Sequence, residues 1–360
     1  EVPETFTKFR KQVESDFAVT PPKDDVREIP IPSAAPALDT DEFSGRFEEF
    51  EVFTNLDFAT DPRAAIEFRG GESRAWERLQ SYFWDQDQLR VYKTSRNGML
   101  GADYSSKFSP WLAHGCLSPR QIYAEVQRYE SERVANESTY WLVFELLWRD
   151  YFALIVAKHG NKAFQIGGLR RQLLPWKQDP ELFDRWRDGK TGFPLIDANM
   201  LELATTGFMS NRGRQNVASF LTKNLGIDWR MGAEWFESML IDFDPCSNYG
   251  NWNYAAGVGN DARGFRWFNT LKQSRDYDPN GSYVRHWIPC LSKVPNEFVH
   301  EPWTLNPHTQ ASLGYVLDQD YPSPVVDLIE SASRNEELYH QEVPIAPSSR
   351  RKGERGRRRS

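Results

Sequence analysis

The stretch at 138–160, STYWLVFELLWRDYFALIVAKHG, constrains the fold of this chain more than any other segment. Ser138 can cap the start of a helix, and Gly160 can end it directly after two basic residues. Glu145 and Arg149 are charged residues on an otherwise apolar helix, and burying them is costly unless they find partners. The stretch therefore predicts one long helix whose charged side chains need partners.

Helical patterns also account for most of the chain after Gly70, where alternating strand patterns are nearly absent. Ser73 is the expected N-cap of the first of these helices, and Ser118 followed by Pro119 is a strong start signal for the next. These patterns predict an all-α domain with no repeats and no βαβ unit. The other helices are expected at 193–207, 210–225, 230–241 and 261–274.

Changes in composition divide the chain into three expected segments. Residues 1–69 contain a short helix at 1–14 and then a long linker rich in Pro, Asp and Thr. Residues 70–305 form the helical domain. Residues 306–360 are rich in proline and polar residues, which predicts an irregular C-terminal extension.

The extension ends in RRKGERGRRRS at 350–360, which is strongly basic although the whole chain has a net charge of −7. This tail contributes +6, so residues 1–349 sum to −13. An Arg/Gly tail can hold the backbone of DNA or RNA without sequence preference. The alternative interpretation is a solvated tail with no dedicated partner.

The three cysteines and six histidines are scattered without the spacing of a metal site. The odd and sparse cysteine count predicts a reducing intracellular compartment. No apolar run approaches the roughly 18 residues of a membrane helix. We therefore expect a soluble protein.

The segment NYGNWNYAAGVGND at 248–261 contains glycines spaced as in a phosphate-binding loop. Rossmann and Walker loops follow a β-strand, and no strand pattern precedes this segment, so a nucleotide loop is excluded. A packing segment and the floor of a cofactor site remain. Trp252 lies within it and is one of thirteen tryptophans, each of which can fill a core, stack on a flat ligand or pass an electron.

Two helices share one arrangement of polar and aromatic side chains, at positions i, i+3 and i+4. They predict two walls of one pocket, and a satisfied polar network inside the core is the alternative. The residues are Glu145, Trp148 and Arg149 in FELLWRD, and Asn211, Arg214 and Gln215 in SNRGRQ.

Two further motifs have groups that suit a nucleotide cofactor. YSSKFSP at 104–110 is a hydroxyl-rich turn, and its hydroxyls, backbone N–H groups and Lys107 suit a pyrophosphate. DFD at 242–244 provides two carboxylates that can hold ribose hydroxyls or pair with an arginine. The amide of Asn248, which follows, can reach a heteroaromatic ring.

The chain resembles the FAD-binding half of the photolyase/cryptochrome family in three segments: FELLWRDYF, TGFPLIDANMLELATTGFMSNRGRQNVASFL and GIDWRMGAEWFESMLIDFDPCSNYGNWNYAAGVGND. A fourth segment, RNGMLGADYSSKFSPWLAHGCLSP, is similar to the DASH cryptochromes of that family. The resemblance covers residues 70–305 nearly without gaps. It implies that residues 1–69 are a remnant of the interdomain connector and that the doubly wound antenna domain is missing from this chain.

The resemblance implies a helical bundle that holds a U-shaped FAD. Lys107 and its neighbours match the segment around the FAD phosphates, and Arg214 and Asp242 match a salt-bridged pair near the isoalloxazine. Asn248 matches the residue facing flavin N5, where Asn favours a stable reduced or neutral-radical flavin. The full set of FAD-binding residues is then Tyr92, Ser105, Ser106, Lys107, Phe108, Ser109, Glu145, Arg149, Arg214, Asp242, Asp244 and Asn248.

The resemblance also implies roles in catalysis and electron transfer. Glu145, Trp148 and Asn248 match the catalytic positions. Trp252, Trp229 and Trp176 match a chain of three tryptophans that conducts electrons between the flavin and the surface. The segment at 248–261 is then a cofactor floor, whose glycines let the backbone approach the flavin.

The implied substrate wall consists of Glu145, Trp148, Asn211, Gln215 and Tyr254. Ordinary pyrimidine-dimer photolyases have Met and a second stacking Trp where this chain has Gln215 and Tyr254. A smaller ring stacks a flipped dimer less well, so it offsets less of the cost of flipping, which is a few kcal/mol in a duplex. Single-stranded DNA should therefore be preferred. The histidines of the branch that repairs (6-4) photoproducts are absent at Asn211 and Gln215.

The resemblance implies a blue-light-dependent, monomeric deoxyribodipyrimidine photolyase that repairs cyclobutane pyrimidine dimers by electron transfer from reduced FAD. The alternative is a photosensory or regulatory cryptochrome that binds nucleic acid without significant repair. The methenyltetrahydrofolate antenna of the family should not be retained, because most of its site belongs to the missing domain.

Overall fold

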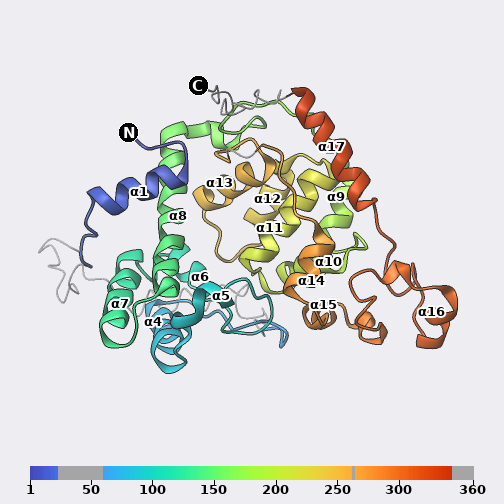
Figure 1. Cartoon of the computed structure of the whole chain (residues 1–360), viewed down its shortest axis with the longest axis horizontal. Coiled ribbons are helices and arrows are strands. Elements are labelled where there is room, and N and C mark those ends of the chain that lie inside the picture. The colour runs from blue at the N-terminus through green and yellow to red at the C-terminus, as the bar shows by residue number, and fades with distance from the viewer. Residues whose placement is uncertain (23–59, 262–263, 343–360) are drawn as a thin grey trace, which may run out of the picture.

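The computed structural model describes residues 1–22, 60–261 and 264–342 (Figure 1). Over these ranges the chain is helical, and its extended pairing is limited to the isolated bridges Lys177–Ile227 and Leu317–Tyr321. The all-α prediction is confirmed. The predicted basic tail and most of the predicted linker lie outside the described residues. None of the described helices has both the length and the apolarity needed to cross a membrane.

The helices of the described residues differ widely in length. The α-helices are α1 (Phe6–Asp16), α4 (Glu72–Gln80), α5 (Tyr92–Ser95), α6 (Ser109–Ala113), α7 (Pro119–Glu132), α8 (Glu137–His159), α9 (Pro180–Arg187), α10 (Pro194–Thr206), α11 (Asn211–Ser219), α12 (Trp229–Met239), α13 (Pro245–Ala256), α14 (Thr270–Tyr277), α15 (Ser282–Trp287), α16 (Pro307–Leu313) and α17 (Leu328–Glu342). A π-helical turn directly follows each of two helices: η1 (Ser81–Asp85) follows α4, and η4 (Phe220–Leu225) follows α11. The 3₁₀ turns are η2 (Gln88–Val91), η3 (Gly160–Phe164), η5 (Pro289–Lys293) and η6 (Pro302–Thr304).

The ends of α8 follow from local hydrogen bonds. Asn136 is the N-cap, and its side-chain oxygen accepts from the backbone N–H groups of Ser138 (2.7 Å) and Thr139 (3.1 Å). The predicted cap, Ser138, is wrong because this residue lies inside the helix, where its hydroxyl accepts from the backbone N–H of Lys93. Gly160 ends the helix as predicted, with a φ of 57°.

Two other predicted helix starts can be compared directly. Ser118 caps α7 in a capping box, so that prediction is confirmed. The prediction for Ser73 is wrong, since α4 begins at Glu72 after Gly71.

Helix α8 lies between two groups of helices (Figure 1). The helices α4 to α7 gather around its N-terminal end, and α9 to α15 form a larger group to one side of it. Helices α5 and α13 make direct contacts with α8 from these two groups. Residues that line the space between α5 and α13 are therefore brought together by α8, although they are far apart in the sequence.

Helix α13 contains residues 248–256 of the glycine-rich segment, and the rest of the segment, 257–261, is turn and non-helical chain. A Cβ at Gly250 would lie 2.3 Å from Cδ1 of Phe152, so this glycine lets α13 approach α8 closely. At Gly250 the close approach is to a side chain of α8, and the prediction that the glycines bring backbone to a cofactor stays a prediction. Gly257 ends the helix with a φ of 84° and lines the cavity described below.

Two predictions in the C-terminal third were wrong. The helix expected at 261–274 begins only at Thr270, where Asn269 accepts from the backbone of Lys272 as the N-cap. The extension after residue 305 contains α16 and α17 rather than irregular chain. Helix α17 forms because it packs on η4: the amide of Asn335 donates to the carbonyl oxygens of Lys223 (2.9 Å) and Asn224 (3.0 Å). Its polar sequence showed no sign of that tertiary support.

Candidate functional site

A cavity of about 550 Å³ lies between α5, α6, α8, α11, α12 and α13. Its volume falls within the range of about 300–1,000 Å³ that is usual for cofactor and small-molecule sites. All the residues predicted for cofactor or substrate binding line this one cavity, although they come from five separate segments of the sequence. They are Tyr92, Ser105, Ser106, Lys107, Phe108, Ser109, Glu145, Trp148, Arg149, Asn211, Arg214, Gln215, Asp242, Asp244, Asn248 and Tyr254.

The hydroxyl-rich turn is held in place by Arg78, a residue that the sequence did not single out. The guanidinium of Arg78 donates to the carbonyl oxygens of Ser105 and Ser106, both at 3.0 Å, and pairs with Asp103 at 2.8 Å. Lys107 takes a left-handed conformation in this turn, with a φ of 55°. Arg78 thus fixes a strained turn at the wall of the cavity from the side of its carbonyl groups.

Lys107 is the buried cation of this wall. Its Nζ lies 3.1 Å from the ring centroid of Tyr104 and has no hydrogen-bond partner among the described residues. Burial, and then the charge of Arg78, lower the pKa of Lys107 well below its usual range. A buried amine without a partner is costly, and an anionic ligand group would remove that cost.

Arg214 and Asp242 form the ion pair that was predicted. Their Nη2 and Oδ2 atoms are 2.7 Å apart, and Arg214 Nε also donates to the carbonyl of Met209. The other carboxylate oxygen of Asp242 is buried and has no hydrogen-bond partner in the described part of the chain. The pair therefore leaves one acceptor available to a ligand.

The start of α13 contributes two further predicted residues. Asp244 is the N-cap of this helix and accepts from the backbone N–H of Ser247 at 2.7 Å. One turn later, the amide of Asn248 donates to the carbonyl of Ala233 on α12 at 3.0 Å. This hydrogen bond fixes the orientation of the Asn248 amide at the cavity wall.

Glu145, a charged residue on an apolar helix, has an ion-pair partner and a hydrogen-bond donor in the structure. Its carboxylate pairs with Arg96 at 2.6 Å and accepts from Trp141 Nε1 at 3.1 Å. Burial raises the pKa of Glu145, while the charge of Arg96 and the Trp141 hydrogen bond act against this rise. Trp148 follows Glu145 by three residues on α8. Its ring lies nearly at a right angle to the ring of Tyr254, with 6.1 Å between the two ring centroids.

Three arginines that the sequence analysis did not identify also line the cavity: Arg96, Arg212 and Arg266. Arg212 lies 4.6 Å from the ring of Tyr277, and Arg266 lies 5.0 Å from that of Phe268. Burial, and the charges of the other two arginines, lower the pKa of Arg212. No motif could have identified this cluster, because its members come from three distant segments.

The three predicted electron-transfer tryptophans differ in burial and in their relation to the cavity. Trp252 lines the cavity and is 2% exposed, and it packs so closely on α12 that a Cβ at Gly232 would lie 2.3 Å from its ring. Trp229 is at the start of the same helix, is fully buried and donates to the carbonyl of Ile166. Trp176 is only partly buried.

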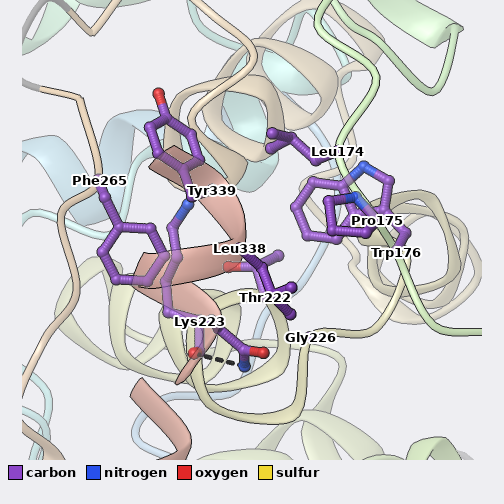
Figure 2. A pocket seen from close by; sticks show the side chains of 10 residues that line it. Leu174, Pro175, Trp176, Thr222, Lys223, Gly226, Phe265, Leu338 and Tyr339 are labelled. Carbon is purple, nitrogen blue, oxygen red and sulfur yellow. Dashed lines mark hydrogen bonds between the residues drawn. The ribbon is translucent and has the colours of Figure 1, made fainter. Parts of the chain in front are cut away.

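Backbone pairing brings the segment of Trp176 next to that of Trp229. Lys177 donates to the carbonyl of Gly226 at 2.8 Å and accepts from the N–H of Asp228 at 3.0 Å. Trp176 also lines a second, small cavity of about 30 Å³, which Figure 2 shows together with Lys223 and Tyr339. Of the three tryptophans, Trp252 thus lines the large cavity, Trp229 is buried and Trp176 is partly exposed, and the path between them stays a prediction.

A family model described as the FAD binding domain of DNA photolyase matches residues 141–341. The fold, the cavity and this match define the class of protein: the chain belongs to the photolyase/cryptochrome family and has its FAD-binding helical domain. Among its relatives are cryptochromes of the DASH type. It is 59% identical to cryptochrome DASH of Gloeobacter violaceus over 94% of this chain and 66% of the relative, and 52% identical to that of Xenopus laevis over 90% and 61%.

Solved structures of the family have the same fold. The cryptochrome of Synechocystis superposes with a TM-score of 0.83 at 51% identity, covering 94% of this chain and 68% of that one. A class III photolyase of Agrobacterium tumefaciens gives a TM-score of 0.80 at 28% identity, covering 95% and 69%. The chain thus spans about two thirds of the length of these relatives. The predicted family and its helical FAD-binding fold are confirmed.

Proposed function

We propose that this chain is a blue-light-dependent lyase that repairs cyclobutane pyrimidine dimers by electron transfer from reduced FAD, preferentially in single-stranded DNA. The observation that carries the proposal is the single cavity that joins the candidate cofactor residues to Glu145, Trp148 and Tyr254. FAD, when bound, supplies absorption of blue light and one-electron chemistry. The protein supplies binding, orientation and a path for electrons.

The residues of the cavity fit FAD in charge and in unused hydrogen-bonding capacity. The Nζ of Lys107 and one carboxylate oxygen of Asp242 are buried without hydrogen-bond partners among the described residues. Lys107 would hold a phosphate, and Asp242 would accept from a hydroxyl or a ring N–H. Arg214 would hold Asp242 in place.

Replacing Lys107 by Met is expected to weaken FAD binding roughly 10- to 100-fold, the worth of a hydrogen bond to a charged group. The FAD-free protein should keep its stability, because the substitution also removes a buried amine. Fluorescence titration with FAD measures the effect. Lys93→Met is the matched control, since Lys93 pairs with Glu137 at 2.8 Å and does not line the cavity. Equal affinities of the two variants would contradict the role of Lys107.

The substrate side of the cavity combines an aromatic surface with cations. Trp148 offers a stacking surface, and Glu145, held by Arg96, offers a carboxyl group to the polar edge of a base. The cluster of Arg96, Arg212 and Arg266 suits DNA phosphates. Because Tyr254 is smaller than a tryptophan, it gives less stacking to a flipped dimer, which favours single strands that need no unpairing.

The tryptophan path supports reloading of the flavin with electrons. Replacing Trp252 by Phe is expected to reduce photoreduction of bound FAD to a small fraction of the wild-type rate, since it removes the member of the path that lines the cavity. Absorption spectra during blue illumination with an external reductant measure this. Trp186→Phe is the control, because Trp186 is also buried and lies 6.3 Å from Trp252, but is outside the proposed path. Similar loss in both variants would contradict the path.

Anaerobic illumination of the FAD-loaded chain with thymine-dimer oligonucleotides, single-stranded and duplex, tests the proposed function. We expect conversion of the dimer to thymines in the single strand and less conversion in the duplex, separated by chromatography. Photoreduction without repair of either substrate would contradict the lyase proposal and favour a photosensory or regulatory role. Equal repair of both would contradict the argument from Tyr254.

A further inference from the structure

Helix α1 begins beside the C-terminal half of α8 and runs outward from it at an angle (Figure 1). Glu4, just before α1, pairs with Lys158 at 2.7 Å and His159 at 3.1 Å. At the other end of α1, Glu14 accepts from the hydroxyl of Tyr140 at 2.7 Å. These contacts fix α1 on α8, and the side chain of Phe6 at its start faces the middle of α8.

Phe6 is the residue of α1 that meets Trp148. Their ring centroids are 3.7 Å apart and their planes differ by 10°, so the two rings are stacked face to face. Phe6 is 7% exposed. Trp148 lines the large cavity and Phe6 does not. Phe6 therefore covers a face of the indole from outside the cavity.

Other aromatic side chains of α8 complete the support behind Trp148. Phe6 meets the ring of Phe144 edge-on at 5.0 Å and that of Tyr151 at 5.6 Å. Trp148 itself contacts Tyr151 and Phe152. Among the described residues these contacts flank the indole, but Phe6 is the ring that lies parallel to it. A parallel neighbour resists the tilt of the indole plane that the edge contacts allow.

We infer that Phe6 is a positioning residue, which holds the ring of Trp148 in the plane needed to stack on a flipped base. The inference rests on the proposed function for the role of Trp148 in binding the lesion. It adds a residue from the segment before the helical domain to the substrate site. A correctly held aromatic surface loses less conformational freedom on binding, so its affinity for the base is higher.

The first experiment measures the orientation of Trp148 without any DNA. The full chain is labelled with fluorotryptophan, and its fluorine NMR signal for Trp148 is assigned with Trp148→Phe. Phe6→Leu keeps an apolar side chain in place but removes the flat ring, and we expect it to shift or broaden the Trp148 signal. Phe9→Leu is the matched control, because Phe9 is buried on the same helix and contacts Tyr151 rather than Trp148. An unchanged Trp148 signal in Phe6→Leu would overturn the inference.

The second experiment measures binding to single strands with and without one thymine dimer, on FAD-loaded protein in the dark. We expect Phe6→Leu to weaken dimer binding about 3- to 10-fold, the worth of one aromatic pair, with no change for the undamaged strand. Phe9→Leu should bind as the wild type does. In the Trp148→Ala background, Phe6→Leu should have no further effect on the dimer.

The outcomes separate the inference from the proposed function. A wild-type protein with no preference for the dimer would contradict the proposed function, while the NMR result still decides whether Phe6 orients Trp148. A normal dimer preference in Phe6→Leu would overturn the role of Phe6 alone. Tighter dimer binding by Phe6→Leu would also overturn it, since Phe6 would then be a cover that competes with the base.

Discussion

Arg214→Met is expected to lower the free energy of unfolding of the FAD-free chain by about 3–5 kcal/mol, because it leaves a buried carboxylate without its partner. The side chain of Asp242 is only 1% exposed, and Arg214 is its partner at 2.7 Å. The second carboxylate oxygen of Asp242 has no partner among the described residues, so nothing near it replaces the lost contact. Urea unfolding followed by circular dichroism measures the change.

Two further variants test this explanation. In Arg214→Met with Asp242→Leu, both charges are replaced by apolar side chains, and most of the stability should return. Arg212→Met removes a neighbouring cavity arginine on the same helix, which donates to the amide oxygen of Asn97 rather than to a carboxylate. Its loss should be clearly smaller. If Arg212→Met and Arg214→Met lose the same stability, the buried pair is not the cause.

Glu202 is expected to make the chain less stable as the pH rises from about 5 to 7. This side chain is 2% exposed and accepts from the hydroxyl of Tyr283 at 2.6 Å. Burial raises the pKa of Glu202 from 4.5 to about 7. In that interval the folded state keeps a proton that the unfolded state releases, so stability present below pH 4.5 is lost as the pH passes the folded pKa. The loss amounts to roughly 3 kcal/mol.

Comparison of Glu202→Gln with the wild type isolates this contribution from other titrating groups. The amide is neutral at every pH and can still accept from Tyr283. The two proteins should be similarly stable near pH 5, and Glu202→Gln should be more stable at pH 8. Glu237→Gln is the control, because exposed Glu237 also accepts from a tyrosine hydroxyl, that of Tyr249 at 2.9 Å. Parallel stability curves for Glu202→Gln and the wild type would contradict the prediction.

Local patterns were sufficient for the fold class and for several helix ends. The capping box at Ser118 and the stop at Gly160 depend on a few adjacent residues, and both were predicted correctly. The N-cap of α8 was placed at Ser138 instead of Asn136, although the capping box of Asn136 and Thr139 is itself a local pattern. Helix α17 was missed because its support comes from η4, which is distant in the sequence.

The candidate site shows the same division between local and distant contacts. The spacing of Glu145, Trp148 and Arg149 on one helix predicted a shared face, and the structure places all three at one cavity. Arg78 and Arg96 were not predicted, although they hold the hydroxyl-rich turn and Glu145. Each lies far along the chain from its partner, and an isolated arginine in a helical pattern gives no sign of what it will contact.

The sequence alone determined that the chain is helical, which family it belongs to and which residue types could hold a flavin. These properties depend on periodicity, capping and motif spacing, all of which act within a few turns of helix. Only the tertiary structure decided that sixteen predicted residues share one cavity and that Phe6 stacks on Trp148. Such contacts join segments far apart in the chain, and they form because burying apolar surface brings whole helices together.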